Sequence, residues 1–289
     1  MNFFFYFLVF ILGLTVGSFL NVISLRYQQD KKISKIIGGR SYCPICFKTL
    51  TWYELIPIFS FFLQRGKCRS CGHKISPQYP LVEILSGLIF VFVPLSLLSS
   101  SISHWSFSQW LIVIVWLLIF SLFLLLSIID FRQSIIPNQI NLSLGILGLI
   151  LIVVNHYYDK FDYLSSSFLR HYAAIFGLRE NIWINYLVAA LLGMAIFGAI
   201  ILLSRGKAMG LGDFKFVGAL GLIFGWPDIL MVIFLAFIIG AVVGIVFLVG
   251  KKKKMKDTIP FGPFLAFGAT ITFFFGYQII DGYFKLFGL

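Results

Sequence analysis

Long uncharged runs divide this chain of 289 residues into segments of membrane-spanning length. The runs lie at 2–25, 84–129, 133–158, 181–204, 216–227, 229–250 and 258–280. A helix that crosses the hydrocarbon core of a bilayer needs about 20 consecutive apolar residues. Because 60% of the residues are hydrophobic and only 12% are charged, a soluble domain could not bury them all, and disorder is excluded. The sequence therefore predicts an all-α polytopic membrane protein.

Two of the runs leave the number of helices open. The run at 84–129 is long enough for two crossings, with a break predicted near the serines and Trp105 of Leu98–Ser108. The run at 216–227 is short, so a helix there must recruit flanking residues or thin the bilayer. The chain has eight transmembrane helices if this run crosses and seven if it does not.

The distribution of Lys and Arg favours eight helices. The segment from Arg26 to Pro80 carries ten basic residues and only two acids, so the positive-inside rule places it in the cytoplasm and the N-terminus outside. With eight helices, 19 of the 23 Lys and Arg face the cytoplasm, including the cluster at Lys251–Lys256, which seven helices would leave outside. Topology and contact with anionic lipid then explain the net charge of +12. No basic–aromatic groove pattern supports nucleic-acid binding.

All four cysteines lie in this cytoplasmic segment, as Cys43-x2-Cys46 and Cys68-x2-Cys71. Two such pairs at this separation are typical of a zinc ribbon, in which four thiolates bind one ion. A pair of disulfides is the alternative, but it requires an oxidising compartment, whereas the charge distribution places the segment in the cytosol. Four protein ligands leave no open coordination position, so the sequence predicts a structural zinc that folds the segment. His73 beside the second pair is expected to be a bystander.

Two aspartates stand at the predicted cytoplasmic boundary. Asp130 ends the helix before it and Asp213 precedes the helix of the short run, so folding could bring the two face to face. Structural roles remain open, because Asp130 could reach the interface beside Arg132 and Asp213 could cap its helix. Gly210 and Gly212 beside Asp213 favour a functional role, since they leave the backbone bare for the approach of a substrate strand.

Two carboxylates in close contact can perform acid–base chemistry together. They share one proton, because both cannot ionise cheaply at short separation. The ionised member would draw a proton from water, and the protonated member would polarise a peptide carbonyl. This is the chemistry of an aspartic protease.

Several short motifs occur in order along the chain. They are Gly17-Ser18-Phe19-Leu20-Asn21-Val22 with Arg26, the two cysteine pairs, Glu54-Leu55-Ile56-Pro57, Ile75-Ser76-Pro77-Gln78-Tyr79-Pro80-Leu81-Val82-Glu83, Asp130 with Pro137, the Gly-x-Gly-Asp-x-Lys box of Gly210 to Lys215, and Pro260-Phe261-Gly262-Pro263. The ordered set resembles the type IV prepilin peptidases, the bacterial membrane aspartic proteases that mature pilins and pseudopilins. The loop at 156–180 and the residues after Phe264 lie outside the resemblance.

The resemblance implies that Asp130 and Asp213 form the catalytic dyad. Gly210, Gly212 and Lys215 would support the site, although Lys215 could equally extend to the membrane surface. It also implies cleavage of a short basic leader after a Gly at the cytoplasmic face, on substrates whose first hydrophobic helix lies in the bilayer. Many members with the cysteine segment also methylate the new N-terminus with S-adenosylmethionine. No recognisable nucleotide-binding loop supports such a site here, so methyl transfer rests on the resemblance.

The resemblance further implies a multi-pass protein of the bacterial inner membrane, whose partners are prepilins or pseudopilins and the lipid bilayer. Residues 1–25 would form the first transmembrane helix, 26–80 the cytoplasmic zinc-binding loop and 81–289 a seven-helix peptidase domain. Glu54 and Glu83 lie in or beside the loop. Contact with a substrate amine or the methyl donor, and a capping or salt-bridge role, are both open for them.

Three other functions remain open. A presenilin-type intramembrane protease shares Gly-x-Gly-Asp, but it lacks the cysteine loop and carries a Pro-Ala-Leu motif that this sequence does not contain. A transporter with a paired-aspartate ion site would place ionisable residues near the bilayer midplane. A non-catalytic assembly factor of a secretion system would keep the motifs without turnover.

Overall fold

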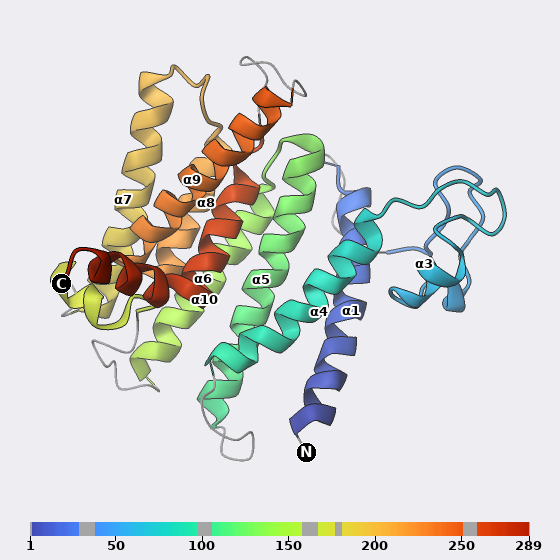
Figure 1. Ribbon diagram of the computed structural model, residues 1–289, viewed down its shortest axis with the longest axis horizontal. Helices are drawn as coiled ribbons and strands as arrows, with labels where there is room; N and C mark the ends of the chain where they lie inside the picture. The colour runs from blue at the N-terminus through green and yellow to red at the C-terminus, as the bar shows by residue number, and fades with distance from the viewer. Residues whose placement is uncertain are drawn as a thin grey trace. The chain divides into compact units, whose positions relative to one another are not determined.

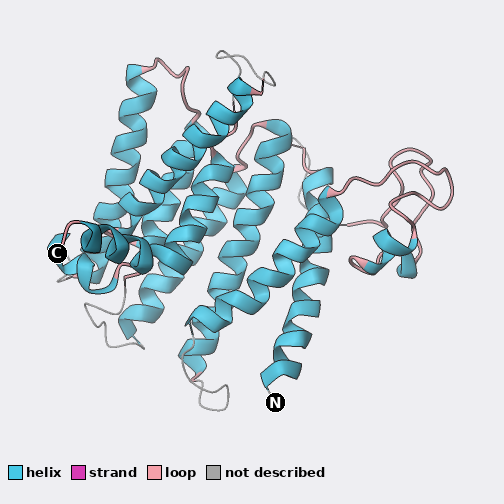
Figure 2. Cartoon of the chain, viewed as in Figure 1, coloured by secondary structure: helices cyan, strands magenta, loops and turns pink. Residues whose placement is uncertain are grey.

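The structure, a computed structural model, describes residues 2–28, 38–97, 106–157, 167–176, 181–250 and 259–288. These residues fold mainly into helices, and the β pairing among them is two isolated bridges, Tyr42 with Thr49 and Lys67 with Lys74 (Figure 2). The predicted all-α class is confirmed. The Lys251–Lys256 cluster, on which the prediction of eight helices depends, lies outside the described residues.

Seven helices of the described chain are long and apolar enough to cross a membrane, namely α1, α4, α5, α6, α7, α9 and α10. The helical segments in chain order are α1 (Asn2–Arg26), η1 (Trp52–Glu54), α3 (Phe59–Leu63), α4 (Gln78–Leu97), α5 (Phe107–Gln133), α6 (Asn138–Tyr157), η3 (Arg170–Phe176), α7 (Ile182–Leu203), α8 (Leu211–Phe224), α9 (Asp228–Val249) and α10 (Gly262–Leu286). The longest run contains two helices, α4 and α5, as predicted, whereas residues 98–105, where most of the predicted break falls, lie outside the described residues.

Helix α8 covers the short run. Its 14 residues span about 21 Å, less than the roughly 30 Å of a bilayer core. It begins ahead of the uncharged run and thereby recruits Asp213 into its first turn. α8 packs against α6 and α7 (Figure 1), with Phe214 near its start beside Gly198 late in α7. Gly221 near its end packs against Ala190 early in α7, so the two helices are antiparallel. An eighth crossing remains a prediction.

The chain divides into two compact units, Met1–Leu125 and Leu126–Leu289, and the boundary falls inside α5. In unit 1, α1 and α4 pack against each other, and the described loop 38–77 lies between them in the chain. Gly17 of α1 lets the two backbones approach, since a Cβ there would lie 2.8 Å from the Cα of Glu83. Small residues commonly permit such close packing between membrane helices.

Unit 2 packs α6 to α10 with the last turns of α5. Phe216, Val217 and Leu220 of α8 are completely buried and form the centre of its core. Hydrogen bonds join the end of α5 to the start of α10, and the start of α6 to the start of α8. Because only a short link separates α5 from α6, all four helix ends lie at the same end of unit 2.

Candidate functional site

Asp130 lies in the last turn of α5 and is only 3% exposed. Its Oδ2 accepts a hydrogen bond from the backbone N–H of Gly262, 3.1 Å away, where α10 begins. The N-terminus of a helix favours a negative charge, so this contact stabilises the carboxylate. The carboxyl group therefore turns into the protein, and not toward the membrane surface as a snorkelling role would require.

Gly262 leaves the space that this carboxylate occupies. A Cβ at position 262 would lie 2.7 Å from Oδ2 of Asp130 and 3.0 Å from the side chains of Ile136 and Leu126. Cβ atoms do not pack within 2.7 Å of another heavy atom. A side chain at this position would therefore displace Asp130.

Asp213 lies in the first turn of α8. Its Oδ2 accepts a hydrogen bond from the backbone N–H of Gly210, 3.3 Å away, which caps the helix. Its Oδ1 is buried and has no hydrogen-bond partner among the residues that the structure describes. Asp213 thus caps its helix with one oxygen, as the structural alternative requires, and leaves the other oxygen available to water or a substrate.

The structure brings the two carboxyl groups together at one end of unit 2, close enough to interact electrostatically. Ile136, in the link between α5 and α6, packs against a glycine beside each carboxyl group. Its Cβ lies 3.0 Å from a Cβ position on Gly212, next to Asp213, and its Cδ1 lies 3.0 Å from that of Gly262. One link therefore packs against both of the backbone segments that hold the carboxylates.

The three residues predicted to support the site have different surroundings. A Cβ on Gly210 would meet nothing closer than 3.8 Å, so the backbone there is bare, as expected. A Cβ on Gly212 would press on Ile136, so this glycine is required by packing within the chain. Lys215 donates a hydrogen bond from Nζ to Oδ1 of Asn138, 2.9 Å away, which ties the start of α8 to the start of α6.

Three residues near the carboxylates were not predicted as part of the site. Gly262 had a signal, the box at 260–263, but its contact with Asp130 depends on how α10 packs. Asn138 and Asn141 stand one turn apart at the start of α6, a spacing that was visible in the sequence. Nδ2 of Asn141 donates to the carbonyl of Gly212, 3.3 Å away, so both amides hold the segment that carries the second aspartate.

The four cysteine sulfurs of unit 1 all lie within 4.8 Å of one another. The sulfurs of Cys43 and Cys71, one from each pair, are 3.9 Å apart, and the thiols are free. With Zn–S bonds of about 2.3 Å, tetrahedral coordination separates neighbouring sulfurs by about 3.8 Å. The donor set therefore fits one zinc ion. His73 is not a member of this group.

Both cysteine pairs adopt the same local turn. The N–H of Phe47 bonds to the carbonyl of Cys43, and the N–H of Gly72 bonds to the carbonyl of Cys68, each at 2.9 Å. Phe47 and Gly72 have φ angles of 58° and 72°, in the left-handed region that reverses the chain after each pair. The repeated turn directs two sulfurs from each pair toward one point.

Backbone N–H groups set the protonation of two groups in the loop. Those of Cys71 and Ser70 lower the pKa of the Cys68 thiol to about 6. The carboxylate of Glu54 accepts the N–H of Thr51 at 2.9 Å and its hydroxyl at 2.7 Å, and the pKa of Glu54 is lowered as a result. Glu54 therefore has a capping role.

Two family profiles match the chain. The "Bacterial Peptidase A24 N-terminal domain" matches residues 11–97, and the "Type IV leader peptidase family" matches residues 116–245. Proteins named prepilin leader peptidase/N-methyltransferase from Xanthomonas campestris pv. campestris, Pseudomonas aeruginosa and Bacillus subtilis are 32%, 30% and 29% identical to it. Each match covers 96% of this chain, and 94%, 93% and 98% of the respective relative. No solved structure matches the chain.

Fold and site together define a polytopic α-helical membrane protein with two carboxylates at one end of a helix bundle and four thiols in a loop. The chain belongs to the type IV leader peptidase family, a family of proteases, since the relatives match it over nearly its whole length. The family resemblance drawn from the ordered motifs is confirmed.

Proposed function

We propose that this chain is an aspartic endopeptidase that removes the leader from type IV prepilins or pseudopilins, cutting after a Gly at the cytoplasmic face of the inner membrane. The observation that carries the proposal is the pairing of Asp130 and Asp213 at one end of unit 2, each held by a glycine N–H. The names of the relatives, prepilin leader peptidase/N-methyltransferase, support the substrate class.

In the proposed reaction the two carboxyl groups share one proton, because both cannot ionise cheaply so close together. The ionised member takes a proton from a water molecule, whose oxygen attacks the peptide carbonyl. The protonated member polarises that carbonyl, and the C–N bond breaks as the leaving amine takes up a proton. Oδ1 of Asp213, which has no hydrogen-bond partner among the described residues, is the candidate acceptor for the proton of this water.

The neighbouring residues position this pair. The bare backbone at Gly210 is where an extended substrate would approach Asp213. Lys215 is bound to Asn138, so its proposed role is to hold the start of α8 in place. Both aspartates stand in terminal helical turns, and a transporter site near the bilayer midplane is therefore not favoured.

The positive-inside distribution supports a topology with the N-terminus outside and both aspartates in the cytoplasm. In this proposal residues 1–25 cross the membrane first, 26–80 form the zinc-binding loop, and 81–289 form the seven-helix peptidase domain. Cys43, Cys46, Cys68 and Cys71 would hold the zinc, which supplies a fold to the loop and no open coordination position for chemistry.

A second activity, N-methylation of the new N-terminus from S-adenosylmethionine, is proposed from the names of the relatives alone. The contacts among the described residues of unit 1 do not identify which residues would bind this donor. Oδ1 of Asn21 and Oγ of Ser86 are buried there without partners among the described residues, but they lie at an interface so close that a Cβ added to Gly17 would be 2.8 Å from the Cα of Glu83. No residue is therefore assigned to the methyl donor.

The test is mass spectrometry of a prepilin incubated with the purified full chain in detergent, with and without S-adenosylmethionine. Asp130→Asn and Asp213→Asn run beside Asp281→Asn, a matched control in α10 whose carboxylate is bound by Tyr172 and Lys285. We expect loss of the leader with wild type and the control only. Cleavage by either dyad variant at the wild-type rate would overturn the dyad, and no cleavage by folded wild type would favour an assembly factor. Gain of one methyl group would establish the second activity.

A further inference from the structure

The described part of the cysteine loop presents large apolar side chains to the outside. Phe59, Phe62 and Leu63 of α3 are 66%, 67% and 71% exposed, and Trp52 of η1 is 77% exposed. We call these four residues the apolar face of the loop. Exposed apolar groups gathered in this way mark a surface that contacts a partner or a membrane.

A hydrogen bond places this face beside a membrane helix. Oε2 of Glu83 accepts the backbone N–H of Ile58, the residue before α3, at 2.7 Å. Glu83 lies five residues after Gln78, the first residue of α4, so the contact falls about 7.5 Å along that helix. Helices that lie in a membrane interface bury their apolar faces about 5–10 Å into the boundary between headgroups and acyl chains. The hydrogen bond therefore holds the start of α3 against the N-terminal turns of α4, which is where that helix would enter the bilayer, and Figure 1 shows α3 projecting sideways from the α1–α4 pair.

The contact with Glu83 is made at a residue with an unfavourable backbone conformation. Ile58 has a φ angle of 63°, in the left-handed region that β-branched residues avoid. The carboxylate that holds it is 6% exposed and is also bound by the hydroxyl of Ser18 on α1. Both helices of the pair thus fix the start of α3.

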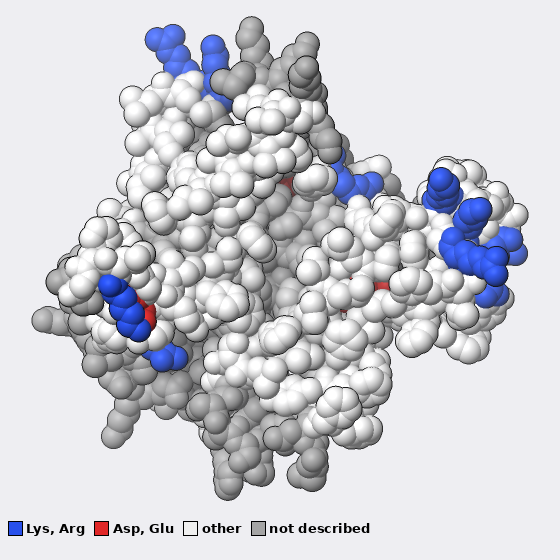
Figure 3. Space-filling view, viewed as in Figure 1, with Lys and Arg blue, Asp and Glu red and all other residues white. Residues whose placement is uncertain are grey.

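The charges around the apolar face match an anionic lipid surface. Glu54 is the one acid in the described loop, and Thr51 binds its carboxylate. Figure 3 shows Lys and Arg gathered on the loop. The basic residues of the described loop are Arg40, Lys48, Arg65, Lys67, Arg69 and Lys74. Basic residues beside an apolar helix attract the phosphates of anionic lipids.

We propose that the cysteine loop is an in-plane lipid anchor, whose apolar face inserts at the headgroup boundary while its Lys and Arg bind anionic phosphates. Glu83 is the positioning residue, because it ties the anchor to α4. The assignment goes beyond the proposed peptidase activity and does not depend on it.

The test uses the full zinc-loaded chain in nanodiscs of phosphatidylcholine with or without phosphatidylglycerol. The chain has six tryptophans, so the signal of Trp52 is taken as the difference between wild type and Trp52→Phe. With lipids brominated on their acyl chains, we expect this difference signal to fall at least about twofold, and to fall further when phosphatidylglycerol is present. A signal that water-soluble iodide quenches and brominated lipid does not, as a protein-binding surface would give, overturns the proposal. Equal quenching with and without phosphatidylglycerol overturns the role of anionic lipid.

Two variants of Glu83 separate positioning from folding. Glu83→Gln keeps an oxygen that accepts the N–H of Ile58, so it should retain the quenching. Glu83→Ala removes the acceptor, and we expect quenching by brominated lipid to be lost while about one zinc per chain remains bound. Unchanged quenching in Glu83→Ala with its zinc retained would overturn the positioning role.

Discussion

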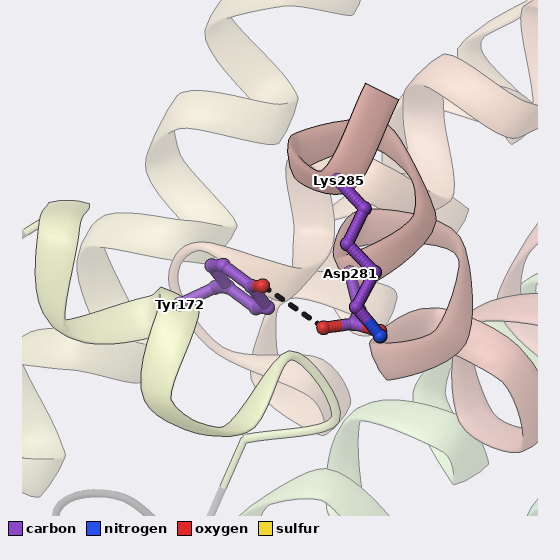
Figure 4. A network of polar contacts seen from close by, with 3 residues as sticks. All are labelled: Tyr172, Asp281 and Lys285. Carbon is purple, nitrogen blue, oxygen red and sulfur yellow. Dashed lines mark hydrogen bonds and ion pairs between the residues drawn. The ribbon is translucent and has the colours of Figure 1, made fainter. Parts of the chain in front are cut away.

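The two ends of unit 2 both carry aspartates, and they differ in how many oxygens have donors. At the end away from the dyad, Asp228 binds the hydroxyl of Ser167 at 2.6 Å and the N–H of Phe168 at 3.3 Å, one with each oxygen. Asp281 likewise uses one oxygen for Tyr172 and the other for Lys285 (Figure 4). At the dyad end Oδ1 of Asp213 has no partner among the described residues.

Burial alone does not distinguish the proposed catalytic aspartates from the others. Asp228 is completely buried, more so than Asp130, yet its donors leave it no oxygen for a substrate. A buried acceptor without a donor carries a free-energy cost of about 1–3 kcal/mol, which folding tolerates where the group has another use. The count of donors therefore distinguishes Asp213, a member of the proposed dyad, from Asp228 and Asp281.

The largest expected effect comes from changing either member of the proposed dyad. Asp130→Asn and Asp213→Asn should each lower the rate of prepilin cleavage by about 10³-fold, because acid–base catalysis contributes about 10²–10⁴-fold. The double variant should be no slower than either single variant, since the pair acts as one unit. Single-turnover rates measure this. If the loss of rate in the double variant equals the product of the losses in the two single variants, the two aspartates act independently.

A methyl group at Gly262 tests whether the position of Asp130 matters as much as its charge. Gly262→Ala places Cβ 2.7 Å from Oδ2 of Asp130, and displacing a catalytic group by about 1 Å costs about 10²-fold in rate. Gly282→Ala is the matched control in α10, because a Cβ there meets nothing within 4 Å. Equal rates for both variants in a cleavage assay would contradict the predicted role of Gly262.

The cysteine loop extends the comparison to the four thiols whose arrangement fits one zinc ion. We expect about one zinc per chain in protein isolated reduced and without chelator. Cys46→Ser should lower this below about half an equivalent, because one ligand of the tetrahedron is lost. His73→Ala is the control and should leave the zinc content unchanged. Metal analysis by mass spectrometry measures the zinc content of both variants. Loss of zinc from the His73→Ala variant would show that His73 is one of the ligands.

The smallest effect on activity is expected at the opposite end of unit 2. Asp228→Ala leaves the donors on Ser167 and Phe168 without an acceptor, which should cost about 1–3 kcal/mol of stability. Thermal unfolding in detergent should shift downward, while the cleavage rate of the folded fraction stays within about twofold. Loss of cleavage without a shift in unfolding temperature would contradict the proposal that Asp228 has only a structural role.

Sequence reasoning reached the helices because hydropathy alone separates them, and the two helices of the longest run, α4 and α5, show this. It could not place the start of α8 at Leu211, because Asp213 and Lys215 lie before the uncharged run at 216–227 and hide the first turn of the helix from a hydropathy pattern. The cap at Gly210 begins the helix ahead of both charges. Hydropathy reports the solvent around a residue, whereas a cap is a local backbone contact.

The dyad illustrates the same limit within the site. Asp130 and Asp213 were predicted at the same side of the membrane, because topology depends only on counting helices. The glycine that holds Asp130 is 132 residues away in the chain, and only the packing of α10 brings it there. Non-local contacts of this kind have no periodic signal in one sequence.

The hydrogen bond from the backbone of Ile58 to Glu83 determines which of these two positions can change in sequence. The donor belongs to the main chain, and every residue except proline supplies it. Substitutions at position 58 should therefore be tolerated, while the carboxylate across from it should not be replaceable by an apolar residue. Glycine at 58 would keep the donor and adopt the φ angle of 63° without strain. The side chain at position 58 can therefore vary while the backbone of the loop keeps the same path.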